Sequence, residues 1–186
     1  QVDPLGHRVT LAYDAAGNQT TTTNPLGLVS TSIFDSQNRL LATENPLGQR
    51  TTLGYDRLGN QVSTTDPLGH VSTSIYDENR RLAARENPLG ERNTIIYNDS
   101  GLAVAQEDPL GNRSTTIYDQ NGRPVAQENA LGERTTSVYD AAGRMIASVD
   151  PLGHRSTSGY DAASRHISST NALDGSGGAV WRAGVW

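Results

Sequence analysis

Residues 108–128 read DPLGNRSTTIYDQNGRPVAQE, and this stretch decides the fold because the chain contains eight versions of it. Its opening turn recurs every 21 residues without insertion or deletion. Every Tyr and Phe of the chain occupies the same place in a repeat: Tyr13, Phe34, Tyr55, Tyr76, Tyr97, Tyr118, Tyr139 and Tyr160. The turn glycine recurs in the same way: Gly6, Gly27, Gly48, Gly69, Gly90, Gly111, Gly132 and Gly153. A fixed period of this length indicates a repeat architecture, in which the recurring residues are structural building blocks.

Each repeat has the composition of a β-hairpin followed by a reversing turn. Residues 108–111 suit a type I turn, and residues 112–118 are a β-prone run rich in Ser and Thr. Residues 119–122 form a second turn, whose Gly favours a bulge, and residues 123–128 form the return strand. The sequence therefore predicts an all-β fold of antiparallel β-hairpin repeats, with sixteen strands in a curved or spiralling sheet: an open shell, a tube or a solenoid-like ribbon.

Two other geometries are consistent with a repeat but fit less well. A parallel β-solenoid with one coil per repeat would stack identical residues on neighbouring strands, yet both turns of the repeat are reversal turns. A helical repeat fails because turn-forming residues return too often for a helix of average length.

The strand pattern gives the sheet two weak faces. Alternation places Arg113, Thr115 and Ile117 on one side, and Ser114, Thr116 and Tyr118 on the other. Neither side is strongly apolar, and a flat single sheet of this kind is marginally stable. We therefore expect the sheet to curl, to wrap onto itself or to pack against another chain.

Composition narrows the function classes. Hydrophobic residues make up 34% and aromatics 5% of the chain, and the net charge of −5 argues against nucleic-acid partners. All 15 basic residues are Arg, which reflects either ordered side-chain stacking or the codon usage of a GC-rich genome. The absence of Cys excludes disulfides and thiolate chemistry, and no apolar run predicts membrane insertion. The chain starts at Gln1 already in phase, so we read it as a piece of a longer array.

A family resemblance rests on the second turn. The segments YDQNGR (118–123) and YDAAGR (139–144) resemble the signature of the Rhs/YD-repeat family, and a preceding Pro-x-Gly, as in Pro109-Leu110-Gly111, belongs to the same pattern. The resemblance covers residue 3 to about residue 170. Departures are local: Phe34 for Tyr, Asn98 for Asp, and Asn38, Arg80 and Ser164 where Gly is expected.

The resemblance implies a long antiparallel ribbon that spirals into a hollow shell. In bacterial polymorphic toxins and insecticidal toxin complexes of this family the shell encloses a toxic cargo, whereas teneurins and wall-associated members lie at the cell surface. Eight repeats would make only part of such a shell. The resemblance does not transfer self-cleavage, because the cap region that carries it is missing here.

The repeated polar residues have structural explanations. The Asp residues that open the second turn lack the dense spacing of a calcium loop, so we predict that they cap their own turns. His7, His70 and His154 lie in repeats that are not adjacent and form no shared site. No hydrolase motif is present. We therefore predict no metal, no cofactor and no catalysis.

Rows of Tyr and Arg have two readings: a packing seam of the sheet itself, or a stacking platform for surface glycans. After the array, residues 1–173, a Gly-rich segment at 174–178 resembles a hinge. The remainder of the tail (174–186) carries Trp181 and Trp186, which we predict to be docking residues.

These observations predict a non-catalytic structural scaffold. It would form part of an extracellular shell or assemble itself into a tube or filament. The expected partners are copies of the same chain or the rest of a longer array. Two alternatives stay open: a cell-surface adhesin or glycan-binding module, and the wall of a toxin-encapsulating shell. The expected location is the outside or surface of a bacterial cell.

Overall fold

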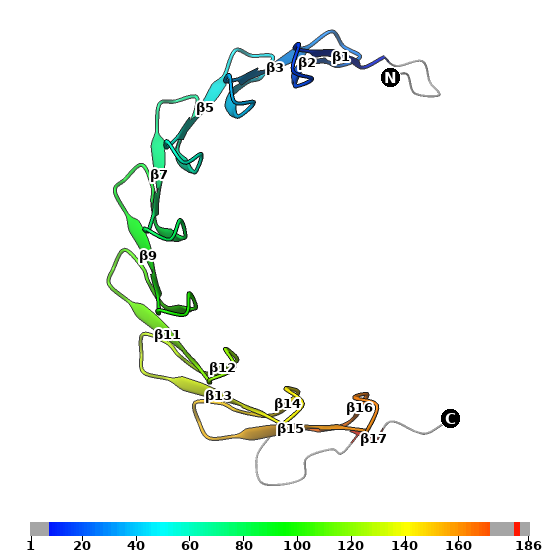
Figure 1. Cartoon of the computed structure of the whole chain (residues 1–186), viewed down its shortest axis with the longest axis vertical. Helices are drawn as coiled ribbons and strands as arrows, with labels where there is room; N and C mark the ends of the chain where they lie inside the picture. Colours follow the sequence, from blue (N-terminus) through cyan, green and yellow to red (C-terminus); the bar gives the residue numbers. More distant parts are fainter. Residues whose placement is uncertain (1–7, 172–180, 183–186) are drawn as a thin grey trace. The chain divides into compact units, whose positions relative to one another are not determined.

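Short β-prone runs separated by tight turns fold into strands throughout the repeat array (Figure 1). The computed structural model describes residues 8–171 and 181–182. Among these residues there is no helix, and so none that is long and apolar enough to cross a membrane. The strands are β1 (Thr10–Tyr13), β2 (Gln19–Thr23), β3 (Val29–Phe34), β4 (Leu40–Glu44), β5 (Arg50–Tyr55), β6 (Gln61–Thr65), β7 (Val71–Tyr76), β8 (Leu82–Glu86), β9 (Arg92–Tyr97), β10 (Ala103–Glu107), β11 (Arg113–Tyr118), β12 (Pro124–Glu128), β13 (Arg134–Tyr139), β14 (Met145–Val149), β15 (Arg155–Tyr160), β16 (His166–Thr170) and β17 (Trp181–Arg182).

The chain divides into two units, residues 1–93 and 94–186. In the first unit, consecutive strands from β1 to β8 pair antiparallel. In the second, consecutive strands from β9 to β17 do the same. Each unit is therefore an open sheet in chain order. The predicted fold of antiparallel hairpin repeats is confirmed, and the parallel solenoid is excluded.

Both turns of the repeat have one backbone geometry. In the turn that opens at Asp119, Gly122 N donates to Asp119 O (3.0 Å) and Asp119 N donates to Arg123 O (2.9 Å). The same two bonds close the turn at residues 108–112. In both turns the fourth residue has a positive φ, which Gly adopts without strain. The sequence predicted a bulge with the second turn only, and the structure confirms it: the two turns share one geometry and differ only in the strand that follows.

That difference is a bulge. After each turn of the Tyr-Asp kind, the return strand carries one extra residue: Tyr118 pairs with Pro124, whereas Ile117 pairs with Ala126, so Val125 has no partner of its own. The register between successive hairpins, as between β12 and β13, has no such shift. A bulge increases the local twist, so every hairpin carries its own bend.

The buried centre of the sheet consists of alanines. The fully buried apolar residues, at 0–3% exposure, are Ala42, Ala84, Ala105, Ala126 and Ala147. Each lies opposite an Ile or Val of the hairpin's first strand, as Ala84 lies opposite Ile75 and Ala147 opposite Val138. No large side chain is fully buried in the part of the chain that the structure describes. The sheet is thus a single layer in which small residues fit under aliphatic neighbours.

Two hairpins meet the same requirement with a different pair. Gly54 faces Ser63, and Gly159 faces Ser168. A Cβ placed on either Gly would lie 2.3 Å from the facing Ser Oγ. The hydroxyl therefore occupies the space of the missing side chain, so Ile/Ala and Gly/Ser are alternative ways to fill one site. Neither pairing was evident from the repeat alignment, because the partners are nine residues apart.

The tail contributes a short edge strand. In β17, Trp181 pairs with Ser169 and Arg182 with Ser168 of β16. Trp186 lies outside the described residues, as does most of the predicted segment 174–186. The domain boundary after residue 173 and the docking role of the two Trp residues stay predictions.

Candidate functional site

Within each unit the turns fall into two rows, because alternate turns of an antiparallel meander lie on opposite edges of that unit's sheet (Figure 1). We call the row of turns that follow the aromatic residues the Tyr-Asp edge. Its described turns open at Asp14, Asp35, Asp56, Asp77, Asn98, Asp119, Asp140 and Asp161. The other row is the Pro-Leu edge, whose described turns open at Asn24, Asn45, Asp66, Asn87, Asp108, Asn129 and Asp150.

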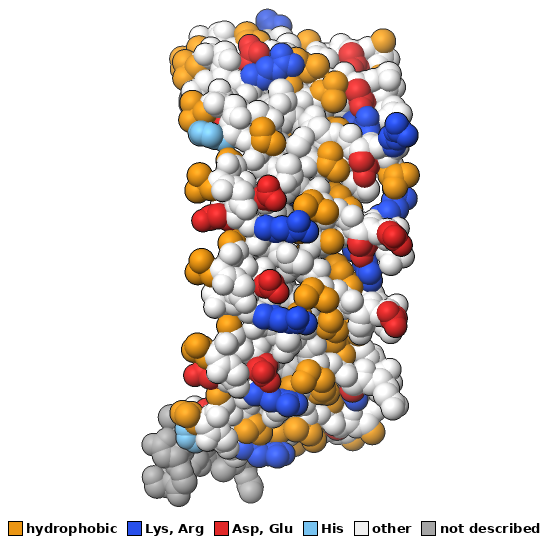
Figure 2. Space-filling view, turned by 90° about the vertical axis from the view of Figure 1, so that its left-hand side faces the viewer, with side chains coloured by type: hydrophobic (Ala, Val, Ile, Leu, Met, Phe, Trp, Pro, Cys, Tyr) orange, Lys and Arg blue, Asp and Glu red, His pale blue; other side chains and the backbone are white. Residues whose placement is uncertain are grey.

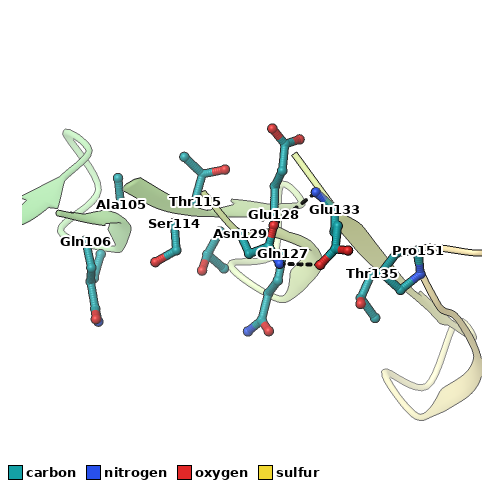
Figure 3. A pocket seen from close by; sticks show the side chains of 12 residues that line it. Ala105, Gln106, Ser114, Thr115, Gln127, Glu128, Asn129, Glu133, Thr135 and Pro151 are labelled. Atoms are coloured by element: carbon teal, nitrogen blue, oxygen red, sulfur yellow. Dashed lines mark hydrogen bonds between the residues drawn. The ribbon is translucent and has the colours of Figure 1, made fainter. Parts of the chain in front are cut away.

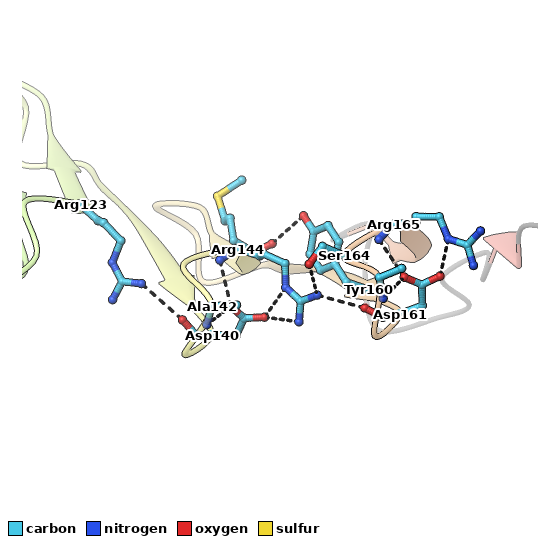
Figure 4. A network of polar contacts seen from close by, with 10 residues as sticks. Arg123, Asp140, Ala142, Arg144, Tyr160, Asp161, Ser164 and Arg165 are labelled. Atoms are coloured by element: carbon cyan, nitrogen blue, oxygen red, sulfur yellow. Dashed lines mark hydrogen bonds and ion pairs between the residues drawn. The ribbon is translucent and has the colours of Figure 1, made fainter.

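At the Tyr-Asp edge, each Asp first stabilises its own turn. Oδ1 of Asp140 accepts hydrogen bonds from Ala142 N and Arg144 N, both at 2.9 Å. Its other oxygen, Oδ2, accepts a bond from Arg144 Nε at 2.7 Å (Figure 4). The backbone bond from Arg144, followed by its side-chain bond, holds the pKa of Asp140 below its usual value. In these contacts the Asp side chain caps its own turn, as the sequence predicted.

The same Arg then reaches the next hairpin. Arg144 Nη1 donates to Asp161 O (3.1 Å) and to Ser164 Oγ (3.2 Å), and its guanidinium lies 5.0 Å from the ring centre of Tyr160 (Figure 4). The Tyr160 hydroxyl in turn donates to Met145 O (3.2 Å). Carboxylate, guanidinium, ring and carbonyl thus join two successive hairpins through side chains.

This tie recurs within both units. Arg39 lies over Tyr55 at 4.7 Å, and Arg123 lies over Tyr139 at 5.0 Å. Both guanidinium groups also donate to the carbonyl of the following turn Asp. A planar, forked guanidinium can pair with a carboxylate, stack flat on a ring and donate to a carbonyl at once, whereas a Lys ammonium has neither the flat face nor the fork. The geometry therefore supports ordered stacking as the reason for Arg at these positions.

The Pro-Leu edge has no equivalent tie among its described turns. The side-chain hydrogen bonds of its turns stay within one turn, as from Asn45 to Gln49 and from Asn129 to Glu133. Nδ1 of His70 lies 2.8 Å from Asp66 Oδ2, a contact that lowers the pKa of Asp66. His154 makes the same contact with Asp150, whereas His7 lies outside the described residues.

Exposed leucines mark this edge. The third residue of each described Pro-Leu turn is a Leu with 81–87% of its surface exposed: Leu26, Leu47, Leu68, Leu89, Leu110, Leu131 and Leu152. Hydrophobic side chains protrude at intervals along one margin of the surface in Figure 2. From the sequence alone these leucines are turn residues and nothing more. A comparison of the repeats could have revealed them. This Leu is the same in every repeat, whereas the residue directly after the turn Gly changes from repeat to repeat.

Polar troughs lie between the strands of each unit. In the second unit, a cavity of about 350 Å³ is lined by Ser114, Thr116, Gln127 and Thr135, among others (Figure 3). In the first unit, a cavity of about 340 Å³ is lined by the corresponding residues of other repeats, including Ser72 and Ser74. These side chains can donate and accept hydrogen bonds, but they form no nucleophile–base pair.

The predicted signature residues occupy equivalent places. The aromatic residues from Tyr13 to Tyr160 end the first strand of each hairpin, and the turn glycines from Gly27 to Gly153 all have positive φ. Gly6 lies outside the described residues. Within the described part of the chain, no group of three or more His, Asp or Glu residues could hold a metal ion.

Comparisons with known proteins identify relatives of this architecture. The RHS Repeat family profile matches residues 1–29, 34–71, 55–92, 118–155 and 139–176. None of the curated proteins matches the sequence. The crystal structure of TcdB2-TccC3-Cdc42 is similar, with a TM-score of 0.73 at 16% identity over 92% of this chain and 11% of that chain. The crystal structure of TcdB2-TccC3-TEV has a TM-score of 0.62 at 14% identity, with the same coverage.

At these identities the similar structures show the fold alone. This chain spans about a tenth of the length of the chains it matches. The family profile covers well over half of the sequence and matches both described units. The chain therefore belongs to the RHS repeat family.

Proposed function

We propose that the chain is a non-catalytic structural scaffold: a segment of RHS-repeat sheet that builds part of an extracellular shell or assembles into a tube or filament. The observation that carries the proposal is the use of the signature residues. The Asp, Arg and Tyr of the Tyr-Asp edge bind one another and the next hairpin, as Arg144 binds Asp140, Tyr160 and the Asp161 carbonyl. Because the polar groups of this motif bind one another within the sheet, the motif serves the structure of the sheet.

The toxin-shell version of this proposal draws on the fold shared with the TcdB2-TccC3 structures. Under it, the chain is one stretch of the wall around a cargo, and its partners are the remaining repeats of a longer array. This version requires that the chain belong to a secreted bacterial protein.

Electron microscopy of the purified chain at several concentrations tests self-assembly. Tubes, filaments or curved walls of regular width are the expected result. Isolated small particles at every concentration would remove the self-assembling version and leave the segment of a longer shell. Turnover of a hydrolase or transferase substrate by the purified chain would overturn the structural role.

A glycan-binding adhesin is the second candidate, and the recurring polar trough favours it. Its lining of Ser, Thr and Gln side chains can hydrogen-bond to sugar hydroxyls. A glycan array probed with the labelled chain tests this candidate, with Gln127→Ala as the binding variant and Gln120→Ala, in an exposed turn, as the control. Binding that is lost only in Gln127→Ala would support the adhesin, and no binding to any glycan would remove it.

A further inference from the structure

The exposed leucines of the Pro-Leu edge are not required by the turns that carry them. The Tyr-Asp edge has the same turn geometry, and its third turn residue is Ala16, Gln37, Leu58, Asn79, Ser100, Asn121, Ala142 or Ala163. On the Pro-Leu edge that position is Leu in every repeat, although the residue after the turn Gly varies freely, from Gln49 to His70 to Glu91. We therefore infer that a contact outside the turn requires Leu at this position.

The leucines also stand beside exposed prolines. In the first unit, Pro25, Pro46, Pro67 and Pro88 precede the four described leucines by one residue, and all are exposed. Each of these leucines keeps 81–83% of its surface exposed, so the first unit presents four exposed Pro-Leu pairs along one edge. Leaving these apolar side chains in water is unfavourable, and repeated exposed apolar pairs along one edge are a candidate interaction surface.

Spacing and charge point to the occupant. Corresponding turns are two strands apart, about 9.6 Å, which leaves room for a Leu from a partner between two leucines of this edge. A partner with the same 21-residue period would stay in register along the whole contact. At the base of two of the turns a Glu lies across the strands from an Arg, Glu44 from Arg50 and Glu128 from Arg134, so these turns present both signs of charge to a copy of the chain.

We propose that the Pro-Leu edge docks onto the Pro-Leu edge of a second copy of this chain, with the leucines of the two copies interdigitated about a two-fold axis. Such an isologous contact uses one surface patch twice and closes on itself. The biological use of this contact rests on the proposed scaffold role, in which it would join one wall to another.

Sedimentation velocity over a range of concentrations tests the contact. The variant carries Leu47→Ser, Leu68→Ser and Leu89→Ser together. The control is Leu58→Ser, which changes an exposed Leu at the same turn position on the Tyr-Asp edge. We expect a concentration-dependent dimer in the unmodified chain and in the control, and at least a 100-fold weaker dimer in the triple variant. Circular dichroism checks that all three chains keep their strands.

Cysteine cross-linking provides a second readout, because the chain contains no Cys of its own. Under mild oxidation, Leu68→Cys should form disulfide-linked dimers much faster than Leu58→Cys. Equal rates, or a chain that stays monomeric at all concentrations, would overturn the proposed contact.

The two proposals fail in different ways. Dimers without tubes or filaments would support the edge contact while removing self-assembly into long structures. Tubes or filaments that the triple variant forms as well as the unmodified chain would support the scaffold while overturning the contact.

Discussion

The two edges of the sheet share a turn geometry but differ in what lies beyond the turn. At the Tyr-Asp edge, a side chain from one turn reaches the next, as Arg123 Nη1 does to Asp140 O. At the Pro-Leu edge, the described turns bind only themselves and expose a Leu to solvent. The same backbone therefore supports one edge whose contacts are internal and one whose apolar surface is uncovered.

This difference separates stability from association. Substitutions at the Tyr-Asp edge should weaken the fold of a single chain, because they remove contacts between hairpins. Substitutions at the Pro-Leu edge should leave the single chain stable and change what it binds. Four predictions test this separation, beginning with the sheet centre that lies between the edges.

The largest effect is expected at the sheet centre, which both edges share. Gly54→Ile places a branched side chain against Ser63 Oγ, and overpacking of this kind costs about 1–3 kcal/mol. Adding Ser63→Ala recreates the Ile/Ala pair of other hairpins, as in Ile75 and Ala84, and should restore most of the loss. Urea denaturation followed by circular dichroism measures both. A double variant as unstable as the single one would contradict the complementarity of the pairs.

The next effect tests the comparison directly. Arg123→Ala removes an ion pair, a ring contact and the bond to the next hairpin, so we expect about 1–2 kcal/mol of destabilisation. Leu110→Ala at the other edge should cost less than about 0.5 kcal/mol when the chain is dilute enough to be monomeric. Arg123→Lys keeps the charge without the fork and should fall between. Equal losses at the two edges would break the proposed division of roles.

A smaller effect is expected where the Tyr-Asp edge departs from Gly. Arg80 has a φ of 63°, a conformation that is unfavourable for a side chain with a Cβ, so Arg80→Gly should stabilise the chain by about 0.5 kcal/mol. Asn tolerates this region, so Asn38→Gly serves as the control with a change near zero. Thermal and urea denaturation report the difference, and a destabilised Arg80→Gly would show that the Arg80 bond to Leu58 O matters more than backbone strain.

The smallest effect distinguishes the edges by pH. Hydrogen bonds lower the pKa of Asp108, the first of them from the Asn112 side chain, and a folded-state pKa below the unfolded value stabilises the fold above about pH 4. That contribution is lost as the pH falls through the lowered pKa. Asp108→Asn keeps the turn acceptor, as Asn87 does naturally, so stability at pH 7 should change little while acid sensitivity decreases.

The corresponding change at the Tyr-Asp edge should behave differently. Asp119→Asn also removes the charge that pairs with Arg123, so it should lower stability already at pH 7. Urea midpoints at pH 7 and pH 3 measure both variants. Identical pH profiles for the two would show that the Arg ion pairs contribute nothing.

Much of the fold followed from the repeat itself. Turn residues at a fixed spacing and β-prone runs between them predicted the strands 113–118 and 124–128 to within one residue. The aromatic and Gly positions could be read in the same way, because each depends on local backbone geometry. The ties between hairpins could not, since Arg144 and Tyr160 are 16 residues apart and meet only after the sheet has formed.

The sequence by itself determined the repeat, the antiparallel hairpins and the turn chemistry, since these depend on contacts within about ten residues of chain. The tertiary structure decided which side chains face one another across strands. It paired Gly54 with Ser63 and Ile75 with Ala84, stacked Arg on the Tyr of the next hairpin, and left one row of leucines without cover. Those outcomes depend on strand register, which only the assembled sheet fixes, whereas the bulge after each Tyr-Asp turn was already indicated by the turn Gly.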